Sequence, residues 1–222
     1  MKRFDCSALV FDLDGVLVDS TAYVEQQWRR WATSRGLRPE PFLRVCHGRR
    51  ALETIRMAAP HLDAEAEVRA FVPLEENASE SLGPLPGAIR LLTALPPGTW
   101  AVATSGIRAV ATSRLRRAGL PVPPVLVCAE DVTRGKPSPD AFLLAARSLG
   151  CPADQVLVVE DAPAGVEAAR AADMAVVALT TTHPADQLAA DACAASLVGV
   201  HLGRVNRAGD GRDRLEVLVV EA

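Results

Sequence analysis

Five short apolar runs alternate with helical patterns along most of the chain, and this alternation constrains the fold more than any other feature. The strand-like runs lie at residues 8–13, 100–104, 125–127, 156–159 and 175–179. They lack polar–apolar alternation, so each is expected to be a strand covered on both faces, as in parallel sheets. The helical patterns between them cover residues 107–118, 140–149, 163–172 and 184–190. Repeated strand–helix–strand units predict an α/β fold with a doubly wound, parallel, Rossmann-like sheet.

Residues 20–83 interrupt this rhythm with helical patterns alone. These patterns lie at residues 21–35, 39–46, 49–59 and 63–81, and the Pro- and Gly-rich residues 82–87 indicate a return linker. We therefore expect an all-helical cap at residues 20–83, inserted into a Rossmann-like core made of residues 1–19 and 84–222. Such a cap would cover the carboxyl edge of the sheet, where open α/β sheets bind ligands.

The C-terminal tail has no functional interpretation. Residues 203–214 are polar and contain glycine, so a loop is expected there, and the apolar residues 215–220 predict one more strand.

Composition excludes several classes of protein. The 222 residues carry a formal net charge of −3 with interspersed signs and 4% aromatics, so no nucleic-acid partner is expected. The five scattered cysteines have no CxxC spacing, which favours reduced thiols in a cytoplasmic protein. The N-terminal apolar run is interrupted by acids, and no window is long and apolar enough for a membrane span. A covered active site requires no partner chain, so we expect a monomer.

Two acids end the first predicted strand. Asp12 and Asp14 are two residues apart, so strand periodicity points both carboxylates the same way. Two close carboxylates repel each other unless a cation stabilises them, and such a pair can divide the roles of nucleophile and acid/base. The alternative is a solvated Asp-Gly turn at Gly15.

Two more strand ends carry groups that could bind phosphate. Thr104, Ser105 and Gly106 offer a hydroxyl and backbone amides at the start of a helix, which suits an anion or a simple helix cap. Lys136 stands in a loop stiffened by two prolines, so its ammonium could face a phosphoryl oxygen. The alternative for Lys136 is an ordinary surface lysine.

A fourth strand end adds two acids. Glu160 and Asp161 follow a buried strand, where carboxylates suit Mg²⁺, although Asp161 could also cap the helix that begins near Pro163. The carboxyl ends of parallel strands share one edge of a sheet. The four groups together therefore predict phosphoryl chemistry at that edge.

The segments FDLDGVL, ATSG, GKPSPD and VVEDAPAG, in this order, resemble the haloacid dehalogenase-like superfamily. The resemblance covers the chain to about residue 200, and it implies a Rossmann-like core with an inserted helical cap. It further implies that Asp12 attacks phosphorus and forms an aspartyl phosphate. Asp14 would protonate the leaving oxygen and then deprotonate the hydrolytic water.

The same resemblance implies the remaining site. Mg²⁺ would be held by the Asp12 carboxylate, the Asp14 backbone carbonyl and Asp161, with Glu160 assisting. The phosphate-binding residues would be Thr104, Ser105, Gly106 and Lys136.

Within the superfamily, the segments HGRRALETI, LPPGTWAVATSG and VEDAPAGVEAARAA look like the glycerol-phosphate and 2-deoxyglucose-6-phosphate phosphatases. This implies magnesium-dependent hydrolysis of a small sugar or polyol phosphomonoester. His47 and Arg49 would lie over the site from the cap, and Arg49 is the stronger candidate because a guanidinium binds phosphate or hydroxyls in a fixed fork. Alternatively, His47 packs inside the cap and Arg49 is solvated.

The similar β-phosphoglucomutases are the runner-up. They carry a histidine twelve residues after the nucleophile, where this chain has Val24. Without that base, returning phosphate to a second hydroxyl is harder, so a mutase is disfavoured. A dehalogenase and a phosphosugar-binding regulator without catalysis are further alternatives.

Overall fold

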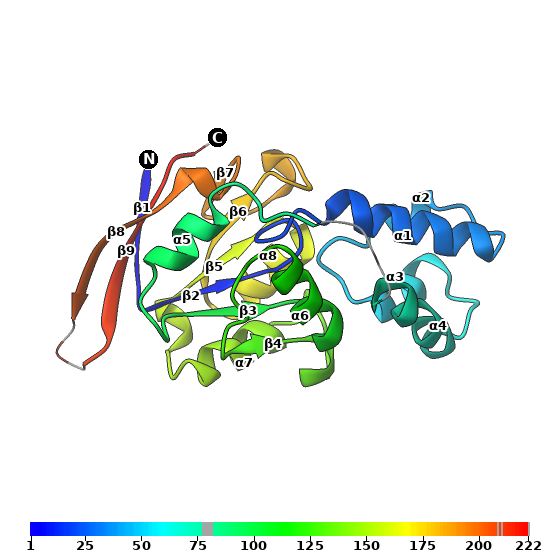
Figure 1. The fold of residues 1–222 in the computed structure, drawn as a ribbon, viewed down its shortest axis with the longest axis horizontal. Coiled ribbons are helices and arrows are strands. Elements are labelled where there is room, and N and C mark those ends of the chain that lie inside the picture. The colour runs from blue at the N-terminus through cyan, green and yellow to red at the C-terminus, as the bar shows by residue number, and fades with distance from the viewer. Residues whose placement is uncertain (77–81, 208, 210, 222) are drawn as a thin grey trace.

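A six-stranded parallel sheet forms the centre of the computed structural model, which describes residues 1–76, 82–207, 209 and 211–221. Its strand order is β4-β3-β2-β5-β6-β7. The strands are β2 (Ala8–Phe11), β3 (Trp100–Ala103), β4 (Leu126–Val127), β5 (Val156–Glu160), β6 (Ala175–Leu179) and β7 (Ala192–Ala194). All neighbouring pairs run parallel, so the predicted doubly wound α/β fold is confirmed (Figure 1).

Both faces of this sheet are covered, which explains why its strands are apolar throughout. In β2, Leu9 and Phe11 join one hydrophobic cluster, and Ala8 and Val10 join another, as the two-residue period of a strand requires. The first cluster takes in α5 (Ala88–Ala94) and α6 (Arg108–Arg117). The second takes in α7 (Asp140–Ser148) and α8 (Pro163–Ala171). Short 3₁₀ turns lie at η1 (Ala129–Asp131), η2 (Ala153–Gln155) and η4 (Leu197–Gly199).

Four helices between β2 and α5 form a separate body, called here the helical segment. They are α1 (Thr21–Ser34), α2 (Glu40–Leu43), α3 (Ala51–Ala58) and α4 (Ala64–Glu76). The end of the helix predicted at residues 63–81 lies outside the described residues. The helical segment stands beside the sheet rather than on either of its faces (Figure 1).

An aromatic cluster holds the helical segment together. Trp28 stacks on Phe71 with ring centroids 4.6 Å apart and on Phe42 at 5.8 Å. Trp31 meets Trp28 edge to face at 5.6 Å. Such pairs add to the free energy of burying the rings. The helical segment therefore has a core distinct from the two clusters on the sheet.

A second, antiparallel sheet joins the two ends of the chain, with the order β1-β9-β8. Its strands are β1 (Lys2–Cys6), β8 (Val200–Arg207) and β9 (Asp213–Val219). The predicted strand at residues 215–220 is confirmed as part of β9, but the loop predicted at residues 203–214 was wrong. Residues 203–207 belong to β8, which is almost wholly exposed and therefore lacks the apolar pattern of a strand.

The helix predicted at residues 184–190 was also wrong, because only the 3₁₀ turn η3 (Ala185–Gln187) forms there. Asp191 then accepts a hydrogen bond from the backbone N–H of Val176 at 2.8 Å and donates its own N–H to Val176 O. These bonds align the three-residue strand β7 with β6. A run of three apolar residues is too short to be recognised as a strand in sequence.

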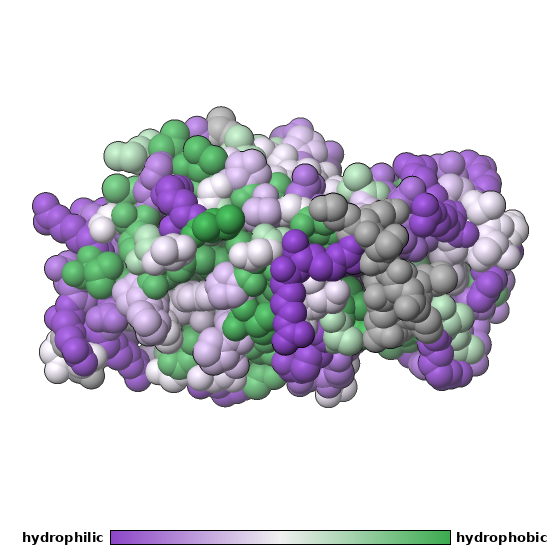
Figure 2. Space-filling model, viewed as in Figure 1, coloured by the Kyte–Doolittle hydropathy of each residue, from purple (hydrophilic) through white to green (hydrophobic). Residues whose placement is uncertain are grey.

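Hydrophilic side chains cover the outer parts of the helical segment and of the β8–β9 hairpin (Figure 2). Among the described residues, no helix has the length and apolar character needed to cross a membrane.

Candidate active site

Lys136 lies at the centre of the residues that the structure brings together. Its ammonium donates to Oδ1 of Asp12 at 2.5 Å and to Oε1 of Glu160 at 2.6 Å. A third bond, of 3.1 Å, reaches the carbonyl of Ala103. These partners lie at the carboxyl ends of β2, β5 and β3, which are neighbours in the sheet. The parallel order therefore gathers groups that are up to 148 residues apart in sequence.

Burial and charge act in opposite directions on Lys136, whose side chain is 1% exposed. Burial alone would lower the pKa of its ammonium, but the carboxylates of Asp12 and Glu160 raise that pKa above its usual range. The ring of Phe142 lies 4.8 Å from the ammonium and adds a cation–π contact. Lys136 is therefore a fixed positive charge beside Asp12 and not a surface lysine.

Asp12 has an unusual protonation equilibrium. Burial raises the pKa of its carboxyl to about 7, although the neighbouring ammonium of Lys136 lowers it. Repulsion from Glu160 and Asp14 raises the same pKa further. A buried carboxylate with one oxygen on a lysine keeps its second oxygen for another partner.

Glu160 is held on both oxygens. Oε1 accepts from Lys136, and Oε2 accepts the backbone N–H groups of Asp161 at 2.8 Å and Ala162 at 3.1 Å. A Cβ on Gly165 would lie 1.8 Å from Oε1, so only glycine fits at this point of α8. The sequence assigned Glu160 to metal assistance, and the structure shows its carboxylate fixing Lys136.

Asp161 has a carboxylate oxygen that lacks a partner. Oδ2 is buried and accepts no hydrogen bond from the described residues. Burial, followed by repulsion from Glu160 and Asp12, raises the pKa of Asp161 well above its usual range. Gly15, at φ +80°, makes room for this carboxylate, because a Cβ there would lie 2.1 Å from Oδ2.

These residues fit a hard divalent cation. A cation would supply the missing partner of Asp161 Oδ2 and offset the repulsion among the acids, and Mg²⁺ takes oxygen ligands of this kind. Within the described part of the chain, no three His, Cys, Asp or Glu side chains form a metal cluster. The ligand set expected from the sequence consists of the Asp12 and Asp161 carboxylates and the Asp14 backbone carbonyl, with Glu160 assisting.

Both carboxylate oxygens of Asp14 accept hydrogen bonds. Ser20 donates its hydroxyl to Oδ1 at 2.6 Å, and Arg114 donates to Oδ2 at 2.7 Å. The guanidinium of Arg114 also lies 5.8 Å from the ring of Tyr23. Sequence reasoning missed Arg114, although its helical spacing places it among Val110, Ala111 and Leu115 on the buried face of α6.

The predicted phosphate cradle follows β3. The Thr104 hydroxyl accepts the N–H of Gly106 at 3.1 Å, which closes a tight turn before α6. The Ser105 hydroxyl donates to the carbonyl of Gly48 at 2.9 Å. This bond ties the end of β3 to the loop that leads into α3.

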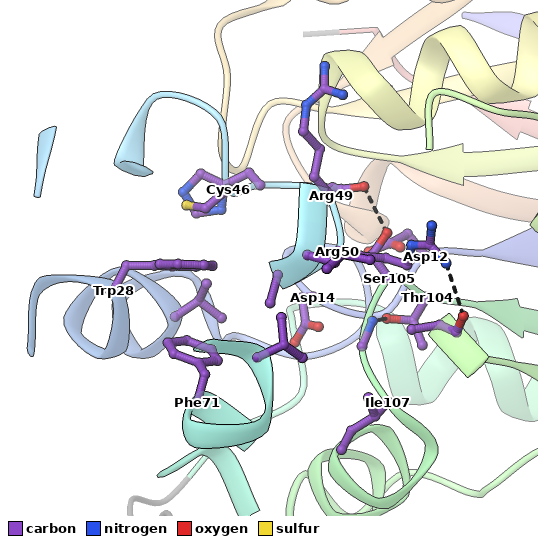
Figure 3. A pocket seen from close by; sticks show the side chains of 18 of the residues that line it. Asp12, Asp14, Trp28, Cys46, Arg49, Arg50, Phe71, Thr104, Ser105 and Ile107 are labelled. Carbon is purple, nitrogen blue, oxygen red and sulfur yellow. Dashed lines mark hydrogen bonds between the residues drawn. The ribbon is translucent and has the colours of Figure 1, made fainter. Parts of the chain in front are cut away.

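His47 and Arg49 lie in that loop with different orientations. His47 Nε2 is 3.4 Å from Glu25 Oε1, and its ring lies 6.1 Å from that of His183. Arg49 is among the residues that line the cavity, but its guanidinium points away from Asp12 and Asp14 (Figure 3). Its predicted contact with substrate stays a prediction.

The neighbouring Arg50, which sequence reasoning missed, connects the helical segment to the core. Its guanidinium donates to the carbonyls of Ala129 at 3.3 Å, Val132 at 3.1 Å and Thr133 at 3.1 Å, and it also pairs with Glu53. The sequence analysis chose Arg49 alone, because no local pattern marks Arg50 as the residue that faces the core.

A cavity of about 280 Å³ lies between the helical segment and the carboxyl ends of the strands. Asp12, Asp14, Thr104 and Ser105 line its core side, and Trp28 and Phe71 line the opposite side (Figure 3). The cavity thus places a buried carboxylate, a second held acid and a fixed cation beside room for a small molecule. This arrangement suits nucleophilic attack with acid–base assistance.

Comparison with known proteins agrees with this chemistry. Residues 6–173 match the haloacid dehalogenase-like hydrolase family. The chain is 46% identical to hexitol phosphatase A of Escherichia coli over 186 residues, which covers 82% of this chain and 85% of the relative. It is 33% identical to glycerol-1-phosphate phosphohydrolase 2 of Saccharomyces cerevisiae over 201 residues, covering 84% and 80%.

Solved structures share the fold. A hydrolase from Pseudomonas syringae superposes with a TM-score of 0.74 at 27% identity, covering 87% of this chain and 94% of that one. A β-phosphoglucomutase from Clostridium difficile superposes with a TM-score of 0.69 at 22% identity, covering 86% and 92%. The latter likeness bears on the fold alone.

Proposed function

The chain belongs to the haloacid dehalogenase-like hydrolase family and is a phosphomonoester hydrolase, and from this premise we propose a mechanism and a substrate class for it. It hydrolyses a small sugar or polyol phosphate through an aspartyl phosphate on Asp12. The observation that carries this proposal is the contact of the Lys136 ammonium with Asp12 on the core side of the cavity. A buried nucleophile beside a fixed cation suits attack on an anionic phosphoryl group.

The reaction proceeds in two steps. In the first, a carboxylate oxygen of Asp12 forms a bond to phosphorus as the bond to the leaving oxygen breaks, and Asp14 gives that oxygen a proton. In the second, Asp14 takes a proton from water, whose oxygen attacks phosphorus and frees Asp12. The products are the alcohol and inorganic phosphate, so atoms and charges balance.

Lys136 and the residues at the end of β3 bind the phosphoryl group in both steps. The ammonium offsets the charge on the phosphoryl oxygens, and the residues Thr104 to Gly106 offer a hydroxyl and amides to them. Arg114 and Ser20 hold Asp14 while its carboxyl changes protonation state.

Mg²⁺ is the proposed cofactor. The Asp12 and Asp161 carboxylates and the Asp14 backbone carbonyl would hold it, and its charge would neutralise the anionic groups that meet at the site. The unpartnered Oδ2 of Asp161 supports this assignment.

The helical segment is proposed to act as a cap, with residues 20–83 as the cap and residues 1–19 and 84–222 as the core. The bonds of Arg50 and Ser105 across the boundary support this division, because they join the segment to the rim of the cavity. The proposed setting is the cytoplasm, in keeping with five free cysteines, and the proposed oligomeric state is a monomer.

A mutase is the weaker proposal. Val24 lines the cavity at the position where the similar mutases carry a histidine, so an apolar side chain stands where a base would be needed.

A phosphate-release screen with Mg²⁺ tests the proposal, using sugar, polyol and nucleotide monophosphates with the wild-type protein and Asp12→Asn. The wild type should favour the sugar or polyol esters, and Asp12→Asn should release no phosphate. If Asp12→Asn still released phosphate, the assignment of Asp12 as nucleophile would be wrong. If a sugar phosphate were converted to its isomer without release of free phosphate, the enzyme would be a mutase.

A further inference from the structure

The loop between β4 and Lys136 wraps around a side chain of the helical segment. This side chain is Arg50, which directly precedes α3. Its guanidinium donates to three backbone carbonyls of the loop, those of Ala129 at 3.3 Å and of Val132 and Thr133 at 3.1 Å. The segment of chain that ends at Lys136 is therefore held from the side of the helical segment.

Glu53 takes the remaining donors of the Arg50 guanidinium. Nε donates to the two carboxylate oxygens of Glu53 at 2.7 and 2.9 Å, and Nη2 also pairs with Glu53. An arginine has five N–H donors in a rigid, planar fork. With two on Glu53 and three on the loop carbonyls, all five are engaged. The carboxylate of Glu53 also balances the charge of Arg50, so Arg50 acts on the loop through the position of its donors.

Gly135 gives the Arg50 side chain the space to lie against the loop. A Cβ on Gly135 would lie 2.6 Å from Nε and 3.1 Å from Cδ of Arg50. The φ of Gly135 is not positive, so the backbone conformation does not require glycine here. Since Glu53 and the loop carbonyls hold the guanidinium, it cannot move aside for a Cβ without losing hydrogen bonds. Arg50 and Gly135 thus form a close contact one residue before Lys136.

The position of this loop bears directly on the Lys136 ammonium. Most side chains of residues 130–134 are exposed, so apolar burial does little to hold the loop. The backbone N–H of Ser138 donates to the carbonyl of Gly135 at 2.9 Å, which closes a turn around Lys136. A shift of Gly135 would therefore carry Lys136 with it. Misplacing a catalytic group by about 1 Å can slow a reaction by about 100-fold.

We propose that Arg50 is a positioning residue, which fixes Lys136 for phosphoryl transfer when the helical segment lies against the core. Closure of the segment then does more than cover the cavity, because it also orders the loop that presents the ammonium. The inference rests on the proposed role of Lys136 at the phosphoryl group and adds the residue that places it.

A double-mutant cycle tests the contact between Arg50 and Gly135. With p-nitrophenyl phosphate and saturating Mg²⁺, kcat per folded molecule is measured for the wild type, Arg50→Ala, Gly135→Ala and the double variant. Arg50→Ala should lower kcat by about tenfold or more and Gly135→Ala by about threefold or more, and the double variant should equal Arg50→Ala. If the two losses multiply, the contact does not carry the effect and the proposal is wrong.

Two further variants complete this cycle. Arg50→Lys keeps the charge but lacks the planar fork, so it should not restore kcat, and wild-type kcat in Arg50→Lys would overturn the positioning role. The matched glycine control is Gly209→Ala, because a Cβ on Gly209 would meet nothing within 4 Å. Its kcat should equal that of the wild type.

Inhibition by inorganic phosphate shows whether Arg50 acts through Lys136. Inorganic phosphate has no alcohol portion that would reach the helical segment, and in the proposed mechanism it binds beside Lys136. Arg50→Ala should therefore raise its inhibition constant by about threefold or more, as expected for coupled groups. An unchanged inhibition constant would show that Arg50 does not act on Lys136.

The variant Lys136→Met distinguishes failure of this inference from failure of the proposed function. If Lys136→Met keeps wild-type kcat, the proposed role of Lys136 is wrong. If kcat falls in Lys136→Met, adding Arg50→Ala should lower it by less than about twofold, because the group that Arg50 places is already gone. A further tenfold loss would refute the inference alone. Should Lys136→Met not fold, the phosphate inhibition of Arg50→Ala decides the question.

Discussion

Nζ of Lys136 lies 2.5 Å from Oδ1 of Asp12, and both side chains are buried. The same ammonium contacts Glu160. Lys136 therefore neutralises buried carboxylates in the folded protein, and in the proposed mechanism it also presents positive charge to the phosphoryl group.

Replacing Lys136 by methionine should damage both tasks. Breaking a buried ion pair from one side leaves an uncompensated charge, so the free energy of unfolding should fall by about 3–5 kcal/mol at pH 8. Phosphate release should fall by at least about 100-fold, because a preorganised electrostatic group is lost. Urea unfolding and steady-state kinetics measure the two effects.

A double variant separates these tasks. In Lys136→Met the buried carboxylates of Asp12 and Glu160 have lost their cation. Adding Glu160→Gln removes one of these charges, so the double variant should recover part of the lost unfolding free energy without recovering turnover. Recovery of turnover in the double variant would show that the Lys136 charge acts on the fold alone.

The metal-free protein should lose stability as the pH rises. Burial raises the pKa of Asp12 to about 7 and that of Asp161 well above its usual range. An unfolded aspartate ionises near pH 4, so between about pH 4 and 7 the folded state keeps protons that the unfolded state has released. A raised folded pKa contributes stability that is complete below the unfolded pKa and is lost as the pH passes through the folded pKa. Thermal melts in EDTA should therefore show a falling melting temperature across this window.

Mg²⁺ should restore the melting temperature at pH values at which the Asp12 and Asp161 carboxyls are ionised. Its addition should raise the melting temperature more at pH 8 than at pH 5, since protons compete with the cation at the lower pH. Asp161→Asn removes a buried charge, so it should melt higher than the wild type in EDTA at pH 8 and gain little from Mg²⁺. Each kcal/mol corresponds to about 2–4 °C in a chain of this size. A Mg²⁺ response that survives Asp161→Asn would place the cation elsewhere.

Gly165 should not tolerate a side chain. In Gly165→Ala the new Cβ would meet Oε1 of Glu160 at 1.8 Å, so the carboxylate that fixes Lys136 must move. We expect a loss of about 1–3 kcal/mol in unfolding free energy, as for other overpacked sites, together with reduced kcat. Gly83→Ala is the matched control, because nothing lies within 4 Å of its added Cβ. Equal stability of the two variants would contradict the close packing of Glu160 on α8.

Arg49 and Arg50 should differ although they are adjacent and alike. Arg50→Gln loses hydrogen bonds to three core carbonyls. Amide hydrogen exchange should therefore quicken in residues 51–58 and 129–133, and kcat/KM should fall by at least about tenfold as the site opens. Arg49→Gln should leave exchange unchanged, because the hydrogen bonds to the core carbonyls come from Arg50 and the Arg49 guanidinium points away from Asp12 and Asp14 (Figure 3). A raised KM in Arg49→Gln alone would instead support the substrate contact expected from the sequence.

Asp14→Asn should separate the two chemical steps on p-nitrophenyl phosphate. The p-nitrophenolate leaving group needs little protonation, so Asp12 should still be phosphorylated in the variant. Hydrolysis of the phosphoenzyme, in contrast, needs a base. We expect a burst of p-nitrophenol followed by turnover slowed about 10²–10⁴-fold, measured by stopped-flow absorbance. Slow turnover without a burst would show that Asp14 is required before phosphorylation.

The sequence predicted the core of the site because each group follows an apolar strand that is itself recognisable. Asp12, Thr104 and Glu160 each lie next to such a strand, and parallel pairing then brings the strand ends together. For Lys136 the sequence left a phosphate contact and an ordinary surface lysine open, since a lysine in a loop has no local mark of burial. Its position depends on Asp12 and Glu160 being there to receive it.

Contacts between distant segments could not be predicted in the same way. Arg114 reaches Asp14 across 100 residues of sequence, and Arg50 reaches Val132 across 82. The first pairing arises within the core once α6 packs beside the end of β2, and the second arises only once the helical segment lies against the core. Strand β8 was missed for a different reason, because its exposed side chains carry no apolar period.

The aromatic cluster of the helical segment also gives the protein an optical property. Of the three tryptophans, Trp28 and Trp31 belong to this cluster, and Trp100 begins β3, at the end of that strand away from the cavity. Ultraviolet emission therefore comes largely from the helical segment, and the edge of one emitting indole borders the space that a substrate would fill. Binding in the cavity should therefore change the emission wavelength and intensity of the intrinsic tryptophan fluorescence, so no attached dye is needed to follow it.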